Sequence, residues 1–79
     1  MNKNCLLGKY QHSRNKEFYE VIGFAMHSET KEEMVIYKAL YASPEYDIDQ
    51  IWVRPKTMFF EEVEHERSIF PRFVKISTR

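Results

Sequence analysis

Two runs of alternating residues, joined by a short polar segment, constrain the fold of this 79-residue chain more than any other feature. In residues 18–26 and again in residues 34–41, apolar side chains recur at every second position, which is the period of a β-strand. Residues 27–33 between the two runs are polar and long enough to reverse the chain. The pattern predicts an antiparallel hairpin with both strands largely covered.

Shorter segments around this hairpin predict further strands. We expect strands over residues 9–12, 51–54 and 70–76, a loop over residues 42–50, and one helical turn over residues 58–63 capped by Thr57. Pro55 ends the 51–54 strand because proline has no backbone donor. The elements indicate a mainly β fold, either a small five-stranded antiparallel SH3-like barrel or a strongly bent sheet with one short helical turn, and an open sheet capped by a helix fits nearly as well.

The length of the chain predicts one domain over residues 1–79. Residues 1–7 are expected to form a frayed N-terminus of this domain. A chain of this size buries roughly 60% of its unfolded surface, so its aromatic side chains are expected to serve mostly one core. Cys5 is the only cysteine, which excludes an internal disulfide and a cysteine-rich zinc site. We expect a cytoplasmic location, because no apolar run is long enough for a membrane span or a secretion signal.

The formal net charge is zero, but the charges are unevenly distributed. Residues 1–16 and 67–79 carry cations and no acid, whereas the middle of the chain carries all twelve acids. If the terminal strands lie side by side, they would form one positive patch from Lys9, Arg14, Lys16, Arg72, Lys75 and Arg79. The alternative is solvated cations on two separate ends. Zero net charge and the lack of a nucleic-acid-binding motif argue against a nucleic acid partner.

The sequence offers few candidates for catalysis or metal binding. His27 and Ser28 are adjacent at a strand end and would point to opposite faces, and no nucleophile motif surrounds Ser28. Hydrogen bonds within the turn are the simpler role for these residues. The histidines and carboxylates match no recognised metal-binding spacing; the histidines are His12, His27 and His65. We therefore expect no enzyme, no metal and no cofactor.

Two arginines with rigid neighbours are the best candidates for ligand binding. Arg54 precedes Pro55, and Arg72 lies between Pro71 and Phe73. A guanidinium held in place suits bidentate recognition of phosphate or carboxylate. The alternative for Arg54 is an internal ion pair with Glu29 or Glu33. Exposed tyrosines beside these cations would add stacking surfaces, and the candidates are Tyr10, Tyr19, Tyr37 and Tyr41.

Several motifs along the chain together resemble a known family. The motifs are Gly8-x-Tyr10-x-His12, Tyr19-x-Val21-x-Gly23-x-Ala25-x-His27-Ser28-Glu29-Thr30, Glu33-x-Val35-x-Tyr37, Leu40-Tyr41, Trp52-Val53-Arg54-Pro55, Met58-Phe59 and Pro71-Arg72-Phe73. They resemble the small bacterial and phage domains grouped as domain of unknown function sixteen-fifty-three. The resemblance implies a compact, SH3-like β protein with no established activity. The chain departs from the family pattern at residues 15–17 and in an acidic insertion over residues 42–50.

The sequence leads to one preferred function and one alternative. The preferred function is a non-enzymatic binding module whose polar groove receives an anionic small molecule, a nucleotide-like ligand or an acidic peptide. A self-associating sponge for such a ligand is one form of this function. The expected groove residues are His12, His27, Ser28, Arg54 and Arg72, beside Tyr10, Tyr37 or Trp52. The alternative is a protein–protein interaction domain that pairs with a partner, or with itself as a homo-oligomer, through an exposed strand edge and the acidic loop of residues 43–50.

Overall fold

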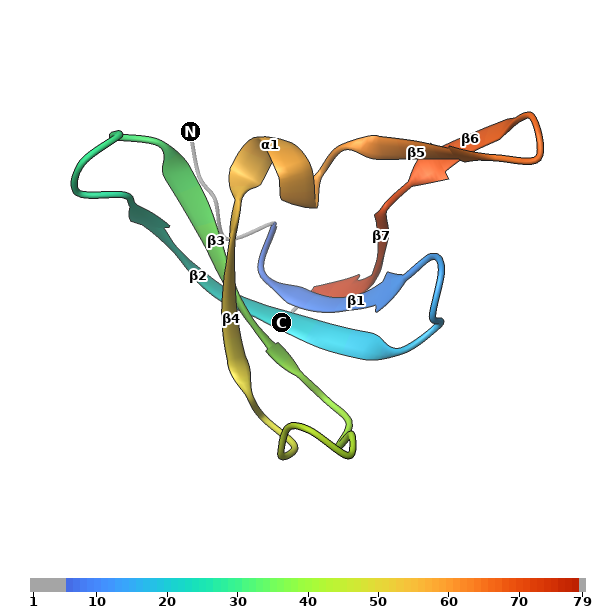
Figure 1. Cartoon of the computed structure of the whole chain (residues 1–79), viewed down its shortest axis with the longest axis horizontal. Coiled ribbons are helices and arrows are strands. Elements are labelled where there is room, and N and C mark those ends of the chain that lie inside the picture. The colour runs from blue at the N-terminus through green and yellow to red at the C-terminus, as the bar shows by residue number, and fades with distance from the viewer. Residues whose placement is uncertain (1–5, 79) are drawn as a thin grey trace.

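The structure is a computed structural model and describes residues 6–78 of the chain. Within these residues the fold is mainly β, with seven strands and one short helix (Figure 1). The helix, α1 (Lys56–Phe59), follows the fourth strand directly. The strands are β1 (Gly8–His12), β2 (Phe18–Met26), β3 (Glu33–Ala39), β4 (Ile51–Pro55), β5 (Glu62–His65), β6 (Ser68–Pro71) and β7 (Phe73–Thr78). Of the frayed end expected over residues 1–7, residues 1–5 lie outside the described part of the chain, whereas Leu7 packs against the core and the Leu6 carbonyl accepts a hydrogen bond from Tyr10.

Five of these strands form one antiparallel sheet in the order β4-β3-β2-β1-β7. The two ends of this order, β4 and β7, are the edges of the sheet, so the sheet is bent and open and does not close into a barrel (Figure 1). The predicted fold class is confirmed in its bent-sheet form. The predicted hairpin is also confirmed, because β2 and β3 pair from Tyr19 opposite Ala39 to Met26 opposite Glu33.

A second hairpin, β5–β6, was not predicted from the sequence. These two strands pair with each other in a separate two-stranded sheet that projects away from the main sheet (Figure 1). The single strand predicted over residues 70–76 is therefore divided, since β6 ends at Pro71 and β7 begins at Phe73. The predicted helical turn over residues 58–63 was also wrong in position. The helix begins at Lys56, with Pro55 at its N-cap in place of Thr57.

The core covers one face of the main sheet and is mostly aromatic. Its buried members are Tyr10, Tyr19, Val21, Val35, Tyr37, Ala39, Phe59 and Phe73. Phe59 comes from α1 and is fully buried, and its ring stacks on Phe73 with 4.1 Å between centroids. The single helical turn thus closes the core over the sheet.

A β-bulge in β2 changes which side chains of this strand face the core. The register of β2 against β3 shifts between Val21 and Gly23. Strict alternation would put Phe24 on the face opposite Val21, but after the shift Phe24 packs against the core. The bulge therefore explains why simple alternation does not assign both halves of this long strand correctly.

Candidate functional site

A hollow of about 350 Å³ opens on the core side of β3 and β4, beside the loop of residues 40–50. Five of the eight side chains around it are aromatic, one is the cation Arg54 and two are polar or acidic. The lining residues are Tyr19, Tyr37, Tyr41, Ser43, Glu45, Tyr46, Trp52 and Arg54, and we call this site the aromatic hollow.

The register between β3 and β4 brings Trp52 and Arg54 to this hollow. Tyr37 pairs with Trp52, and Val35 pairs with Arg54. Directly opposed side chains in an antiparallel pair lie on the same face of the sheet. Because Tyr37 and Val35 are buried core residues, Trp52 and Arg54 face the core side and not the outer surface.

The loop of residues 40–50 supplies the opposite wall of the aromatic hollow. The Ser43 hydroxyl accepts a hydrogen bond from the Tyr46 amide at 3.1 Å, and the Ser43 amide donates to the Tyr46 carbonyl at 2.9 Å. This closed turn holds the Tyr46 ring edge-on to Trp52, with 4.9 Å between centroids. The loop thereby adds an aromatic ring that strand periodicity could not predict.

Two tyrosine hydroxyls meet at the rim of the hollow. The hydroxyls of Tyr19 and Tyr41 lie 2.6 Å apart, and the Asn15 side-chain amide donates to Tyr19 at 3.3 Å. The hydrogen bond to Tyr19, together with burial, raises the pKa of Tyr41 to about 12. The Tyr41 phenol is therefore neutral at physiological pH and can offer a hydrogen bond without charge.

Arg54 is the cation of the aromatic hollow and has no internal partner among residues 6–78. Its side chain is half-buried, yet it forms no hydrogen bond or ion pair with another described residue. Glu33, one of its two predicted partners, lies 3.4 Å from the Nζ atom of Lys56 instead. The other, Glu29, is exposed in the β2–β3 turn. The guanidinium of Arg54 is thus available to a ligand.

Arg72, in contrast, has an internal partner. Its Nη2 atom donates to the Glu61 carboxylate at 2.6 Å. This ion pair connects the segment between β6 and β7 to the segment that follows α1. A backbone hydrogen bond, donated by the Arg72 amide to the Glu61 carbonyl at 3.0 Å, joins the same two segments. Arg72 therefore acts first as a structural residue.

His12, in β1, lies within electrostatic reach of Arg54, Arg72 and Arg14. Its ring packs edge-on to Phe73 at 4.9 Å between centroids. Burial, and then the charges of Arg72, Arg54 and Arg14, lower the pKa of His12. Its Nδ1 atom accepts from the Arg14 amide at 3.1 Å, so the ring also holds the β1–β2 turn. The charges of three arginines thus act on one imidazole.

The remaining sequence candidates lie elsewhere. Tyr10 is 2% exposed and donates its hydroxyl hydrogen to the Leu6 carbonyl at 2.8 Å, which makes it a core residue. His27 and Ser28 are exposed in the β2–β3 turn, where His27 Nδ1 accepts from backbone amides. This turn follows the far end of β2 from Tyr19, roughly 25 Å away along the strand. The proposed groove residues therefore do not gather in one place.

Only part of this set reaches the site. Arg54 and Tyr37 line the aromatic hollow. The His12 ring lies 6.3 Å from the ring of Tyr19, which also lines it, whereas Arg72 lines a different hollow together with Glu61. Sequence reasoning missed Ser43, Glu45 and Tyr46, which belong to a loop without periodicity. The tyrosine content of the loop was the one available signal.

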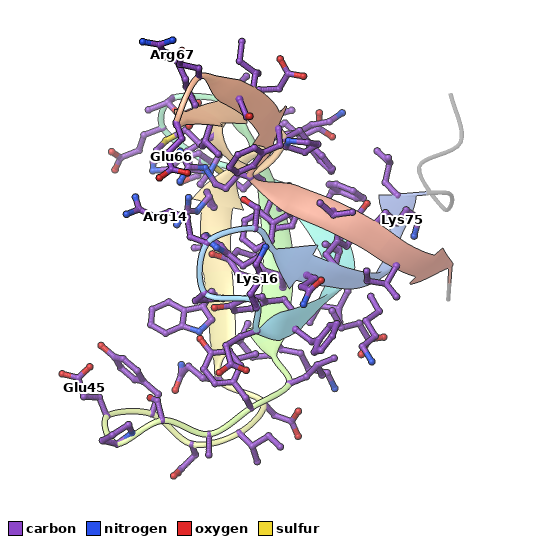
Figure 2. The ribbon with its side chains drawn as sticks, turned by 90° about the vertical axis from the view of Figure 1, so that its right-hand side faces the viewer. Arg14, Lys16, Glu45, Glu66, Arg67 and Lys75 are labelled. Carbon is purple, nitrogen blue, oxygen red and sulfur yellow. The ribbon has the colours of Figure 1, made fainter. Side chains whose placement is uncertain are left out.

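The predicted single positive patch is divided in the structure. Arg14 and Lys75 project to opposite sides of the molecule (Figure 2). Lys75 donates to the Leu7 carbonyl at 2.7 Å, and the Lys9 ammonium lies over the Phe18 ring at 4.4 Å. Arg79 lies outside the described residues. Among the described cations of the terminal segments, Arg14 borders one hollow with Arg72 and another with Lys16.

The described residues contain neither a metal cluster nor a spanning helix. Residues 6–78 hold no group of three or more histidine, cysteine, aspartate or glutamate side chains that could bind a metal, with the side chain of His65 outside the description. No helix in the same part of the chain is long and apolar enough to cross a bilayer.

Fold and site together define a small β domain with an open, bent sheet and an aromatic hollow beside one edge strand. The chain belongs to the family described as Protein of unknown function (DUF1653), whose family model matches residues 8–75. The resemblance seen in the motifs is thereby confirmed. Among curated proteins, no sequence matches this chain.

A solved structure supports the same assignment. The crystal structure of a DUF1653 protein from Bordetella bronchiseptica is similar to this chain, with a TM-score of 0.78 and 27% sequence identity. The similarity covers 92% of this chain and 88% of the other. Since the family description assigns no function, a functional argument must come from the site itself.

Proposed function

We propose that this protein is a non-enzymatic binding module that takes a small anionic ligand with a planar ring, such as a nucleotide, in the aromatic hollow. The observation that carries the proposal is Arg54, a half-buried guanidinium without an internal partner, facing five aromatic side chains. A guanidinium binds a phosphate or carboxylate through two parallel charge-assisted hydrogen bonds. Aromatic rings stack on bases and contribute about 1–3 kcal/mol for each base.

The size and the charge of the hollow fit such a ligand. Its volume of about 350 Å³ falls in the range of small-molecule sites and is small for a folded peptide. Glu45 is the one acid in the lining, and it is exposed and directed away from the sheet at the outer end of its loop (Figure 2). Solvent screens an exposed carboxylate, so Glu45 opposes an anion bound at Arg54 only weakly.

Calorimetric titration with mononucleotides tests this proposal. The Arg54→Gln variant keeps most of the side-chain length but removes the charge, and it is expected to weaken binding by about tenfold or more, as for loss of a charged hydrogen bond. Arg67→Gln is the matched control, because it removes an exposed cation at the tip of the β5–β6 hairpin (Figure 2). Equal affinity in the parent and Arg54→Gln, or no binding of any mononucleotide, would refute the proposal.

The exposed edge of β4 favours a second candidate, a protein–protein interaction domain. β4 is an edge of the main sheet, and its outward side chains Ile51 and Val53 are 50% and 58% exposed. A partner strand, or β4 of a second copy, could extend the sheet there beside the acidic loop of residues 43–50. Light scattering after size exclusion tests self-association. A monomer at high concentration, unchanged by Val53→Lys, would count against a homo-oligomer.

A further inference from the structure

We infer that the ligand is a short single strand of nucleic acid, with one base in the aromatic hollow and the next phosphate and base in a second hollow beside residues 13–16. The inference rests on the proposed function of the aromatic hollow and specifies its ligand. It requires a second aromatic surface, unpaired cations near it, and a connection between the two sites.

The second hollow has a volume of about 380 Å³ and is lined by Ser13, Arg14, Lys16 and Phe70; we call it the basic hollow. The side chains of Arg14 and Lys16 are exposed and form no hydrogen bond or ion pair with another described residue. Both come from the β1–β2 turn (Figure 2). An aromatic ring beside two available cations is the arrangement with which proteins bind single strands, since the ring takes a base and the cations take phosphates.

The β1–β2 turn joins the two hollows. Asn15, in the middle of this turn, donates to the Tyr19 hydroxyl at 3.3 Å, and Tyr19 lines the aromatic hollow. Its neighbours Arg14 and Lys16 line the basic hollow. Arg54 lines the aromatic hollow, and Arg14 and Lys16 line the basic hollow, so each aromatic surface has at least one cation beside it. Stacking rings with cations beside them suit the alternating bases and phosphates of a strand.

Acidic side chains limit how far a strand can extend. Arg14 also borders a third hollow of about 330 Å³, whose lining includes Glu61, Glu62 and Glu64. These carboxylates repel phosphates, and Glu61 already forms an ion pair with Arg72. We therefore expect contact with only about two or three nucleotides, fewer than the roughly 4–16 nucleotides that an OB fold covers. Zero net charge excludes strong long-range attraction to duplex DNA but does not describe the local field at these cations.

Trp52 makes the inference directly testable, because it is the only tryptophan of the chain and lines the aromatic hollow. Its fluorescence would be titrated in the full chain with thymidine 5′-monophosphate and with oligothymidylates of increasing length. We expect affinity to rise by about fivefold or more from one to three nucleotides, as a second stacked base provides. Strands longer than three nucleotides should gain further apparent affinity only because they offer more positions at which the protein can bind.

Two double variants separate the basic hollow from the fold. Arg14→Gln with Lys16→Gln should lose the gain with length but keep mononucleotide affinity. Lys31→Gln with Arg67→Gln is the matched control, because it also removes two exposed turn cations, and it should keep the gain. Both variants should retain the dispersed amide spectrum of the parent.

The outcomes distinguish the inference from the proposed function. If mononucleotides bind but length adds no affinity, or if a duplex binds as tightly as the single strand, the inference is overturned and the proposed function stands. If neither mononucleotides nor strands change the Trp52 signal, both are overturned. A gain with length that survives in Arg14→Gln with Lys16→Gln also overturns the role of the basic hollow.

Discussion

Replacing Phe59 with alanine tests whether the single turn of α1 closes the core. Phe59 is fully buried, and its ring stacks on Phe73 and meets Tyr10 and Tyr37 edge-on, at 5.5 and 5.2 Å between centroids. Phe59→Ala removes this ring from the middle of an aromatic cluster. The surrounding rings come from different strands, so they cannot all move inward to fill the space.

The expected loss of stability is large for a domain of this size. Burial of a phenylalanine removes roughly 150–250 Å² from water, which at about 25 cal/mol per Å² corresponds to roughly 4–6 kcal/mol. Alanine recovers part of that term and leaves a cavity, and measured Phe→Ala changes in cores cost about 3–5 kcal/mol. A 79-residue domain is stable by roughly 4–12 kcal/mol in total. Phe59→Ala should therefore remove much of the free energy of unfolding.

Urea unfolding followed by circular dichroism measures this loss. Met58→Ala is the control, because Met58 lies in the same helical turn but is 46% exposed, and it should cost less than about 1 kcal/mol. A loss below about 1 kcal/mol for Phe59→Ala as well would refute the claim that α1 closes the core.

Three further predictions concern pH and the site. The lowered pKa of His12 means that its neutral form contributes stability above the ordinary value of 6.5, and that this contribution is lost as the pH falls through the folded pKa. His12→Asn keeps an acceptor for the turn, so urea unfolding should show a smaller loss on acidification than in the parent; an equal loss would contradict this. Absorbance titration should show one tyrosine ionising near 12, a step absent in Tyr41→Phe. Because that pKa is raised, the parent should lose the corresponding stability as the pH rises above 10.0. Tyr46→Ala should weaken mononucleotide binding about fivefold or more by removing a stacking ring, whereas unchanged affinity would exclude the loop wall from the site.

The strands with regular alternation could be predicted from the sequence. The β2–β3 hairpin follows from apolar residues at every second position, and the edge position of β4 follows from Pro55. The β5–β6 hairpin could not be predicted in this way. β5 has one apolar residue, Val63, among acids, and its turn places Glu66 and Arg67 at positive φ without a glycine or asparagine to signal it.

The candidate site could be predicted only where it lies on strands. Tyr37 and Arg54 share a face because of the strand period and the antiparallel register. Tyr46 and Ser43 belong to a loop whose shape depends on its own hydrogen bonds, which the sequence pattern does not reveal. His27 and Ser28 were placed in the groove because of their polarity, but the length of β2 keeps them at the other end of the sheet.

The most direct test of the account is the guanidinium signal of Arg54 in a two-dimensional NMR titration with thymidine 5′-monophosphate, assigned by its absence in Arg54→Gln. If the aromatic hollow binds the ligand, the Arg54 Nε–H and Trp52 indole signals will shift together and saturate at the same ligand concentration, while the Arg67 signal stays in place. Shifts confined to Arg67 and other exposed cations, with Arg54 and Trp52 unchanged, would contradict it.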